Sequence, residues 1–335
     1  MRHHHVRQKG RTRLSTSELA GVYDLPVPVW VEHEAFGART MTGLRGLPFE
    51  VRLPHRTVLE GLDMLSPPEL PGVSDDHEKL ASRPWAMNYM AEPTAPSMAL
   101  CRIGLVCEVN DENAARSRFT DEVSQSHRVG DALVERIESW FDGVRSWAEV
   151  STGQDLDFKH PVADAEDPAE GLLLAEDGDL QSSGHGRFTM REVVPVTLAQ
   201  WIHILALAAA GRKPPVEYLL MRDANAANVR GLSRRAVLDA ATATEIVLNR
   251  ALTKAAEAMP DGARQKYLKK QRMLGTLMTD LKEAGVEFEQ PWADLRSLAD
   301  LRNDAIHSGS EPDPLEAAVA VMTAGRFVNQ NGTLS

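Results

Sequence analysis

Apolar residues recur at helical spacing along the C-terminal third of the chain, and this pattern leaves little alternative to a bundle of helices. The longest run begins after Ser233, a good helix cap, and ends at Pro260. Shorter runs at Gln265–Ala284 and Pro314–Val328 repeat the pattern, with short connections between them. Residues 213–330 are therefore predicted to form an all-α helical bundle. The apolar positions of the longest run are Val237, Ala240, Ala241, Thr244, Leu248, Ala251, Leu252 and Ala255.

One helix of this bundle, expected between Pro291 and Gly309, carries side chains suited to chemistry. Arg302, Asn303 and His307 lie within about one and a half turns of it. On a helical projection Asn303 and His307 share a face, whereas Arg302 lies in the apolar arc. A guanidinium does not lose its charge, so Arg302 needs a carboxylate partner, a subunit interface or an anionic ligand.

The same residues also have an ordinary structural interpretation. Arg302 can extend from a core helix to solvent, and His307 can belong to the last helical turn, where a cation suits the helix dipole. Asn303 is then a surface residue. Glu245, at the edge of the long apolar run, is either the partner of Arg302 or a solvated carboxylate on a helix flank.

The segment from Arg302 to His307 resembles the Arg-x(4-6)-His motif of the HEPN superfamily, in which Asn often follows the Arg. Leu219–Ala224 and Arg234–Glu245 resemble the first two helices of that superfamily. The resemblance covers residues 214–330 and implies a HEPN-like helical bundle. It further implies a metal-independent endoribonuclease that acts as a homodimer, without a cofactor. Relatives with the motif also include proteins that only bind, so the alternative is a non-catalytic dimerisation and nucleotide- or RNA-binding module.

The resemblance assigns a role to each motif residue. RNA carries a 2′-hydroxyl beside each phosphate, so a base and a cation suffice for cleavage without a metal. His307 would act as general base or acid, Arg302 would stabilise charge on the phosphoryl oxygens, and Asn303 would position His307 or the phosphate. Cleavage requires Arg302 and His307 from two chains in one open cleft. A purely structural protein would instead pair Arg302 with Glu245 inside one subunit.

The charge of the chain bears on RNA binding. A net charge of -11 argues against binding through the overall field of the protein. Most of the excess acid, however, precedes Pro214. Within the C-terminal region a basic run either carries an RNA backbone to the site or is a solvated helix face. This basic run consists of Arg264, Lys266, Lys269, Lys270 and Arg272.

Residues 15–212 are predicted to form an α+β domain, with a mixed sheet and helices, that ends at a boundary near Gly211–Pro215. A helix from Asp131 onward carries Trp140 and Trp147 on its apolar side, where core packing explains them best. The pairing of this domain with a candidate effector domain predicts that it senses a protein or small-molecule trigger and gates the C-terminal domain. The resemblance to the HEPN superfamily implies that such a protein is a toxin or an antiphage-defence effector. Strand formers gather at Val27–Glu34, Phe49–Leu53, Met98–Val109 and Arg187–Val194.

Other features determine the expected cellular compartment of the chain and which of its segments are expected to lack regular structure. No apolar run is long enough to span a bilayer, and Cys101 and Cys107 are too far apart along one strand for a disulfide, so a cytoplasmic location is expected. Residues 1–14 are expected to be a disordered basic tail, either an arm or the remnant of a tag, and no metal site is predicted. Residues 66–79 and 155–179 are predicted to be exposed loops.

Overall fold

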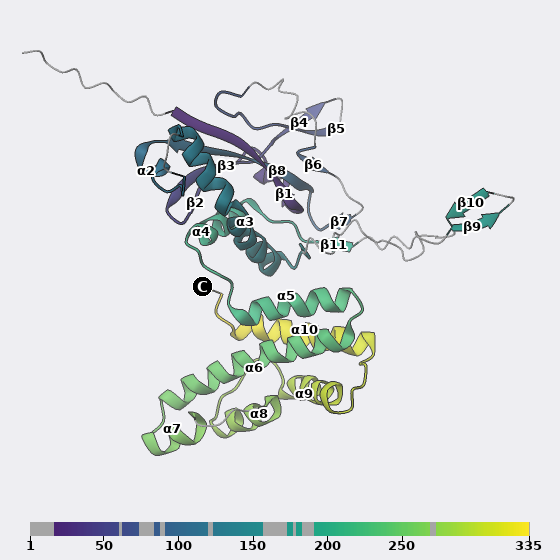
Figure 1. Cartoon of the computed structure of the whole chain (residues 1–335). Helices are drawn as coiled ribbons and strands as arrows, with labels where there is room; N and C mark the ends of the chain where they lie inside the picture. The colour runs from purple at the N-terminus through teal and green to yellow at the C-terminus, as the bar shows by residue number, and fades with distance from the viewer. Residues whose placement is uncertain are drawn as a thin grey trace, which may run out of the picture.

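The chain was analysed as a computed structural model. It has an N-terminal antiparallel sheet with accompanying helices, followed by a helical C-terminal region (Figure 1). The predicted order of an α+β region and an all-α region is confirmed at this level. The structure describes residues 17–59, 62–73, 84–87, 91–119, 123–156, 173–176, 179–182, 191–268 and 273–334, so the predicted tail at 1–14 lies outside the described residues.

A five-stranded sheet forms the centre of the N-terminal region, in the order β1-β8-β3-β2 with β6 beside β8. The prediction of a mixed sheet is wrong for this sheet, because each of its described pairings is antiparallel. The tight turn at Arg45 and Gly46, both with positive φ, joins neighbouring strands in the way that only antiparallel pairing allows. The strands are β1 (Ser17–Glu32), β2 (Arg39–Leu44), β3 (Leu47–Arg52), β6 (Ala86–Met87) and β8 (Ser97–Val109).

Strands β1, β3 and β8 cover most of three segments that the sequence predicts as strands. The fourth predicted strand, Arg187–Val194, is described only from Arg191 onward. Its described part includes β11, which pairs in parallel with β7 outside the main sheet. The free cysteines Cys101 and Cys107 both lie on β8. The smaller elements are η1 (His33–Ala35), β4 (His55–Leu59), β5 (Leu62–Ser66), β7 (Ala91–Pro93), α2 (Asp111–Ala114), β9 (Leu173–Glu176), β10 (Asp179–Ser182) and β11 (Arg191–Val193).

Two helices, α3 (Gln125–Thr152) and α4 (Leu198–Ala209), form the main hydrophobic core with the sheet. The interpretation of Trp140 and Trp147 as core residues is confirmed, because both are buried in this cluster. The prediction of exposed loops is wrong at several described positions, since Leu173–Glu176 form β9 and Pro68 is buried. Leu70 is buried beside Trp85, and Leu156 is buried in the main core, because each completes a cluster that the sheet and helices leave open.

The C-terminal region contains α5 (Val216–Val229), α6 (Ser233–Glu257), α7 (Asp261–Leu268), α8 (Leu274–Glu283), α9 (Trp292–His307) and α10 (Pro314–Asn331). The single helix predicted at Gln265–Ala284 is wrong. Its described part is divided between α7 and α8, and α8 begins where a carboxylate of α6 accepts a hydrogen bond from the Leu274 N–H. Ser233 is not the helix cap that the sequence predicts, since it is the first buried residue of α6. Glu311 instead accepts a hydrogen bond from the Arg234 N–H at 3.1 Å.

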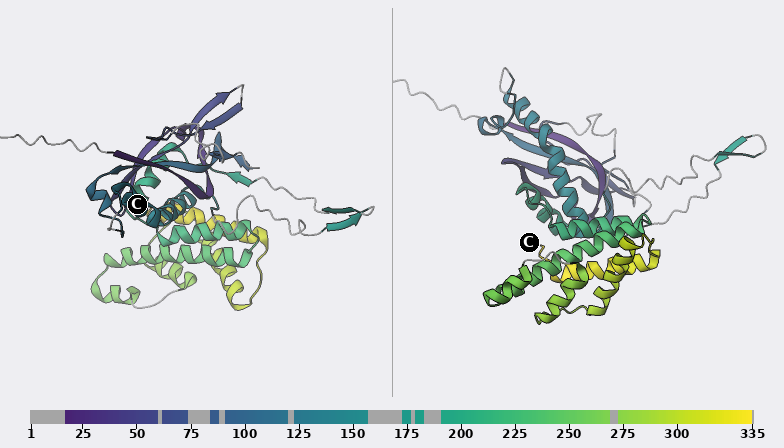
Figure 2. Two further views of the ribbon diagram at one scale, coloured as in Figure 1. Left: turned by 45° about the horizontal axis from the view of Figure 1, so that its top comes forward. Right: turned by 60° about the horizontal axis from the view of Figure 1, so that its bottom comes forward.

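The larger clusters of buried hydrophobic residues divide at the segment Gly211–Pro215, which joins α4 to α5. The two regions meet where α3 lies beside α5 (Figure 2). Val150 of α3 packs against the C-terminal cluster, and the Trp147 indole N–H donates to the Arg212 carbonyl at 2.9 Å. None of the helices in the described part of the chain has both the length and the apolar character needed to cross a bilayer.

Candidate functional site

Arg302 lies on α9, and its side chain is turned toward α6 rather than into open solvent. Its Nη2 is 3.6 Å from Glu245 Oε1, and its Nη1 donates a hydrogen bond to Asn303 Oδ1 at 3.2 Å. The side chains of Arg302 and Glu245 are 15% and 18% exposed. A distance of 3.6 Å is too long for a hydrogen bond, so the charge pair is loose. Among the described residues, Asn303 is the only hydrogen-bond acceptor that the guanidinium contacts.

Glu245 has a second and closer partner. Its Oε1 accepts a hydrogen bond from the Leu274 backbone N–H at 3.1 Å, at the first residue of α8. The N-terminus of α8 has no side-chain cap of its own, so Glu245 satisfies one of its free N–H groups from α6. Glu245 therefore joins three helices, with α8 held by a hydrogen bond and α9 by a charge pair. The sequence left two interpretations of Glu245 open, and the structure places it beside Arg302.

His307 is separated from the Arg302 contacts, although the two residues belong to the same motif. It is the last residue of α9 and is exposed, and it makes no hydrogen bond or ion pair with the described residues. Asn303 is half-buried and contacts Arg302. Within one chain the structure brings Arg302, Asn303 and Glu245 together and leaves His307 at the open end of the helix.

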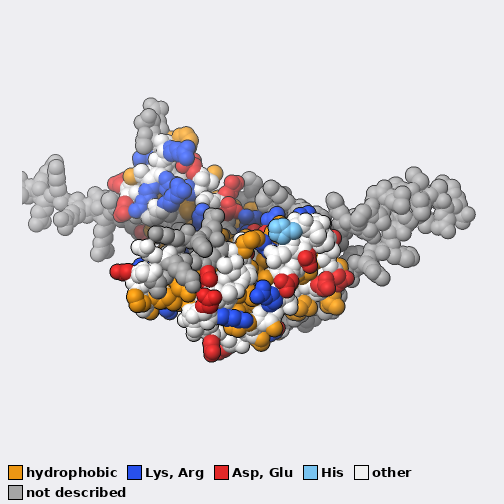
Figure 3. All heavy atoms as spheres, turned by 90° about the horizontal axis from the view of Figure 1, so that it is seen from below, with side chains coloured by type: hydrophobic (Ala, Val, Ile, Leu, Met, Phe, Trp, Pro, Cys, Tyr) orange, Lys and Arg blue, Asp and Glu red, His pale blue; other side chains and the backbone are white. Residues whose placement is uncertain are grey.

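The predicted basic run is described only in part. Arg264 is exposed on α7, and Lys266 belongs to the same helix. Lys269, Lys270 and Arg272 lie outside the described residues. Seen from below, acidic, basic and hydrophobic side chains are interspersed over the described part of the C-terminal helices (Figure 3). The described side chains on this face thus do not gather into a field of one sign.

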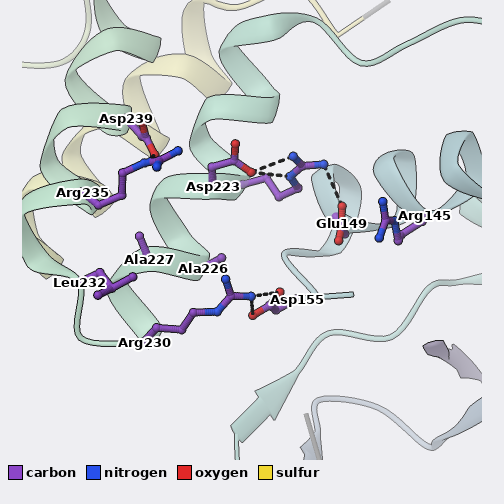
Figure 4. A pocket seen from close by; sticks show the side chains of 11 residues that line it. Arg145, Glu149, Asp155, Asp223, Ala226, Ala227, Arg230, Leu232, Arg235 and Asp239 are labelled. Atoms are coloured by element: carbon purple, nitrogen blue, oxygen red, sulfur yellow. Dashed lines mark hydrogen bonds and ion pairs between the residues drawn. The ribbon is translucent and has the colours of Figure 1, made fainter. Parts of the chain in front are cut away.

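A pocket of 410 Å³ lies between the two regions of the chain, and the sequence did not predict it. Its wall combines α3 residues with residues of α5 and α6, so the pocket exists only where the regions meet (Figure 4). The residues that line the pocket do not follow one helical repeat in the sequence, because they come from separate helices and from the chain after α3. The lining residues are Arg145, Glu149, Asp155, Arg222, Asp223, Ala226, Ala227, Arg230, Leu232, Arg235 and Asp239.

Ion pairs cross this pocket from one region to the other. Arg222 Nη1 donates to Glu149 Oε2 at 2.9 Å, and its Nη2 donates to Asp223 at 2.8 Å. Arg230 Nη2 contacts both carboxylate oxygens of Asp155, at 2.7 and 2.8 Å. Two charge pairs thus link α5 to the end of α3 and the chain that follows it (Figure 4).

The carboxyl group of Glu149 is the most buried charge in the pocket wall, with a side chain that is 6% exposed. Burial raises the pKa of Glu149 above its ordinary value, although Arg222, Arg145 and the Leu156 N–H act in the opposite direction. The hydrogen bonds and charges around it therefore only partly offset its loss of hydration.

Comparisons with models of protein families, with curated proteins and with solved structures found no match to this chain. In the described part of the chain no group of three or more His, Cys, Asp or Glu side chains is arranged to hold a metal ion.

Proposed function

We propose that the chain is a HEPN-type metal-independent endoribonuclease, a toxin or antiphage-defence effector, with Arg302, Asn303 and His307 as its catalytic residues. The observation that supports this proposal most is the incomplete pairing of the Arg302 guanidinium with protein acceptors. A buried arginine with a structural role is expected to be saturated by carboxylate hydrogen bonds, whereas this guanidinium has one hydrogen bond to an amide. The remaining N–H groups of Arg302, which have no acceptor among the described residues, are available to a phosphate.

The proposed reaction uses the 2′-hydroxyl of RNA as the nucleophile. A base takes the proton from that hydroxyl, and the oxygen attacks the adjacent phosphorus as the bond to the 5′-oxygen breaks. His307 serves as the base or as the acid that protonates the leaving oxygen, and Arg302 stabilises the charge on the phosphoryl oxygens. Asn303, which accepts from Arg302, holds the guanidinium in one orientation. The products are a 2′,3′-cyclic phosphate and a 5′-hydroxyl.

The proposal includes a homodimer, because Arg302 and His307 do not meet within one chain. An exposed apolar stripe on α10 supports this part of it. Leu315, Val319 and Met322 are 73%, 49% and 62% exposed, and they lie on one face of the helix. A row of large apolar side chains on an exposed helix face is typical of an interaction surface.

The stripe suits a second copy of the same chain. Together with Arg326, its residues are spaced by four, three and four positions, a series that reads the same in both directions. In an antiparallel pair around a two-fold axis, Val319 would face Met322 of the partner subunit. Glu316 and Arg326, which make no ion pairs among the described residues, would then come close across the axis.

Sedimentation of purified protein tests the dimer. Val319→Asp is expected to weaken dimerisation at least about tenfold, because it places a charge in the apolar centre of the interface. The control is Val134→Asp, which changes a valine on α3 that is 74% exposed and lies outside the stripe. Glu316→Arg should also weaken the dimer, and the double variant Glu316→Arg/Arg326→Glu should restore it. A monomeric wild type would contradict this arrangement.

The cleavage experiment compares wild type, Arg302→Ala and His307→Ala on RNA in the presence of a chelator. Each variant is expected to lose about 10²–10³-fold in rate, because each removes one group that acts on the transition state. Arg296→Ala, an exposed arginine on the same helix, is the matched control and should keep full activity. Growth arrest on expression should follow the same order. Folded variants that cleave like wild type would refute the proposal.

The second candidate is a non-catalytic dimerisation and nucleotide- or RNA-binding module, or a structural protein. The proximity of Arg302 to Glu245 within one subunit favours the structural protein, because this is the pairing expected of a structural arginine. RNA binding without cleavage by wild type would select the binding module. A large loss of stability in Arg302→Ala, without any cleavage by wild type, would select the structural role.

The basic run and the N-terminal domain complete the proposal. Arg264, Lys266 and the following basic residues would attract the RNA backbone, and reversing their charge should lower the salt dependence of RNA binding. The N-terminal domain would gate the nuclease in response to a protein or small-molecule trigger. Deleting it, from a start near Pro214, should leave a folded C-terminal domain whose cleavage no longer depends on that trigger.

A further inference from the structure

The pocket between the two regions has a wall that is unusually rich in guanidinium groups. Arg145 comes from α3, Arg222 from α5 and Arg235 from α6, and Arg230 directly follows α5. Four carboxylates share the wall, so the pocket is nearly neutral when it contains only solvent. An arginine keeps its charge when it is desolvated, and its planar group matches the oxygens of a phosphate or carboxylate.

Arg222 is fully engaged, since its Nε, Nη1 and Nη2 all donate to carboxylates. Arg145 is held much less. Among the described residues its one ion pair is with Asp142, at 3.3 Å. Asp142 lies three residues earlier on the same helix and is 67% exposed. Its Nε is buried and has no hydrogen-bond partner among the described residues. Arg145 thus has a buried donor that nothing in the described protein satisfies.

Arg235 is the second cation with donors to spare. It forms its ion pair with Asp239 on the same helix through Nε, and its side chain is 64% exposed. It reaches the pocket from the side opposite Arg145. Ala227 and Leu232 lie on the Arg235 side of the pocket, whereas Asp223 and Glu149 lie between the two arginines (Figure 4). The pocket therefore has an incompletely paired cation on each side, with small and apolar side chains beside Arg235.

We propose that this pocket binds a small organic phosphate, with the phosphate group held by Arg145 or Arg235 and the body of the ligand against Ala227 and Leu232. The pocket volume of 410 Å³ is within the range of small-molecule sites. A bound ligand would contact α3 together with α5 and α6, so it would stabilise the junction of the two regions. This inference concerns a site distinct from Arg302 and does not rest on ribonuclease activity.

The test measures the thermal stabilisation of the full chain by AMP, inorganic phosphate and adenosine at up to about 10 mM. AMP should stabilise wild type most and inorganic phosphate less, whereas adenosine should have no effect. The double variant Arg145→Gln/Arg235→Gln should weaken AMP binding at least about tenfold, because charged hydrogen bonds to the phosphate are lost. Arg118→Gln, an exposed arginine outside the pocket with one ion pair to Glu135, should bind AMP like wild type.

A variant that is expected to bind AMP more tightly provides an independent test in case the double substitution impairs folding. Asp142→Asn removes the carboxylate that competes for Arg145, so AMP should bind this variant several-fold more tightly than it binds wild type. The proposal is overturned if neither AMP nor phosphate stabilises wild type. It is also overturned if adenosine is as effective as AMP, or if Arg118→Gln weakens AMP binding as much as the pocket variant does. None of these readouts involves RNA cleavage.

Discussion

Two arginines of the C-terminal helices are held in different ways, and the difference separates a structural cation from one that is available to a ligand. Arg222, at the junction of the regions, donates to two carboxylates at 2.8 to 2.9 Å. Arg302, inside the bundle, has a carboxylate only at 3.6 Å and a hydrogen bond to an amide at 3.2 Å. Both side chains are largely buried, so burial alone does not distinguish their roles.

The partners of the two arginines explain this contrast. The carboxylate of Glu149 accepts from Arg222 and from the Leu156 N–H, and it has no other hydrogen-bond partner in the described part of the chain. Glu245 is instead engaged by the N-terminus of α8, which competes with Arg302 for the same oxygen. A carboxylate that already caps a helix holds a neighbouring cation less tightly. The comparison therefore predicts that stability depends on Arg222 and that activity depends on Arg302.

The largest expected effect on stability belongs to Arg222→Met. This change leaves the buried carboxyl of Glu149 without its cationic partner, so the free energy of unfolding should fall by about 2–4 kcal/mol. Urea denaturation measures the difference. The double variant Glu149→Gln/Arg222→Met removes both charges and should recover part of the loss. If Arg222→Met were as stable as wild type, Arg222 would not be a structural cation.

A smaller effect is expected from Glu149 as the pH changes. Burial raises the pKa of Glu149 in the folded protein. Its contribution to stability is therefore fully present below the unfolded pKa, near about 4.3, and is lost as the pH rises through the folded pKa. Wild type should lose stability relative to Glu149→Gln between about pH 4 and pH 7. Urea denaturation at both pH values checks this, and parallel behaviour of the two proteins would contradict it.

The smallest expected effect on stability is that of Arg302→Met. Because the charge pair with Glu245 is loose and Glu245 keeps its hydrogen bond to Leu274, the free energy of unfolding should change by less than about 1 kcal/mol. The same urea experiment measures it beside Arg222→Met. A loss as large as that of Arg222→Met would mean that Arg302 is mainly structural, and the contrast between the two arginines would disappear.

Much of the fold follows from local patterns in the sequence. The strand β8 and the helices α6, α9 and α10 have strong period-two or helical patterns, and each lies close to its predicted position. The division between α7 and α8 was missed because the carboxylate that caps α8 belongs to α6, far away in the sequence. The antiparallel order of the sheet was missed because strand pairing is a long-range property.

The two candidate sites also differ in how far the local sequence reveals them. The conflict between the charge of Arg302 and its apolar arc is visible within one helix, and its neighbour Glu245 lies at the edge of another predicted stripe. The sequence contains no comparable sign of the pocket between the regions. Glu149, Arg222 and Asp155 are ordinary charged residues in the sequence, and only the docking of α3 on α5 brings them together.

The most direct test of the proposed function is the chemistry of the RNA ends that wild type produces in the presence of a chelator. A single-site RNA substrate should yield a 2′,3′-cyclic phosphate and a 5′-hydroxyl, and a 2′-deoxy substitution at the cleaved nucleotide should abolish the reaction. Arg302→Ala and His307→Ala should give neither product. Cleavage that persists without the 2′-hydroxyl, or ends that carry a 5′-phosphate, would contradict the mechanism assigned to Arg302 and His307.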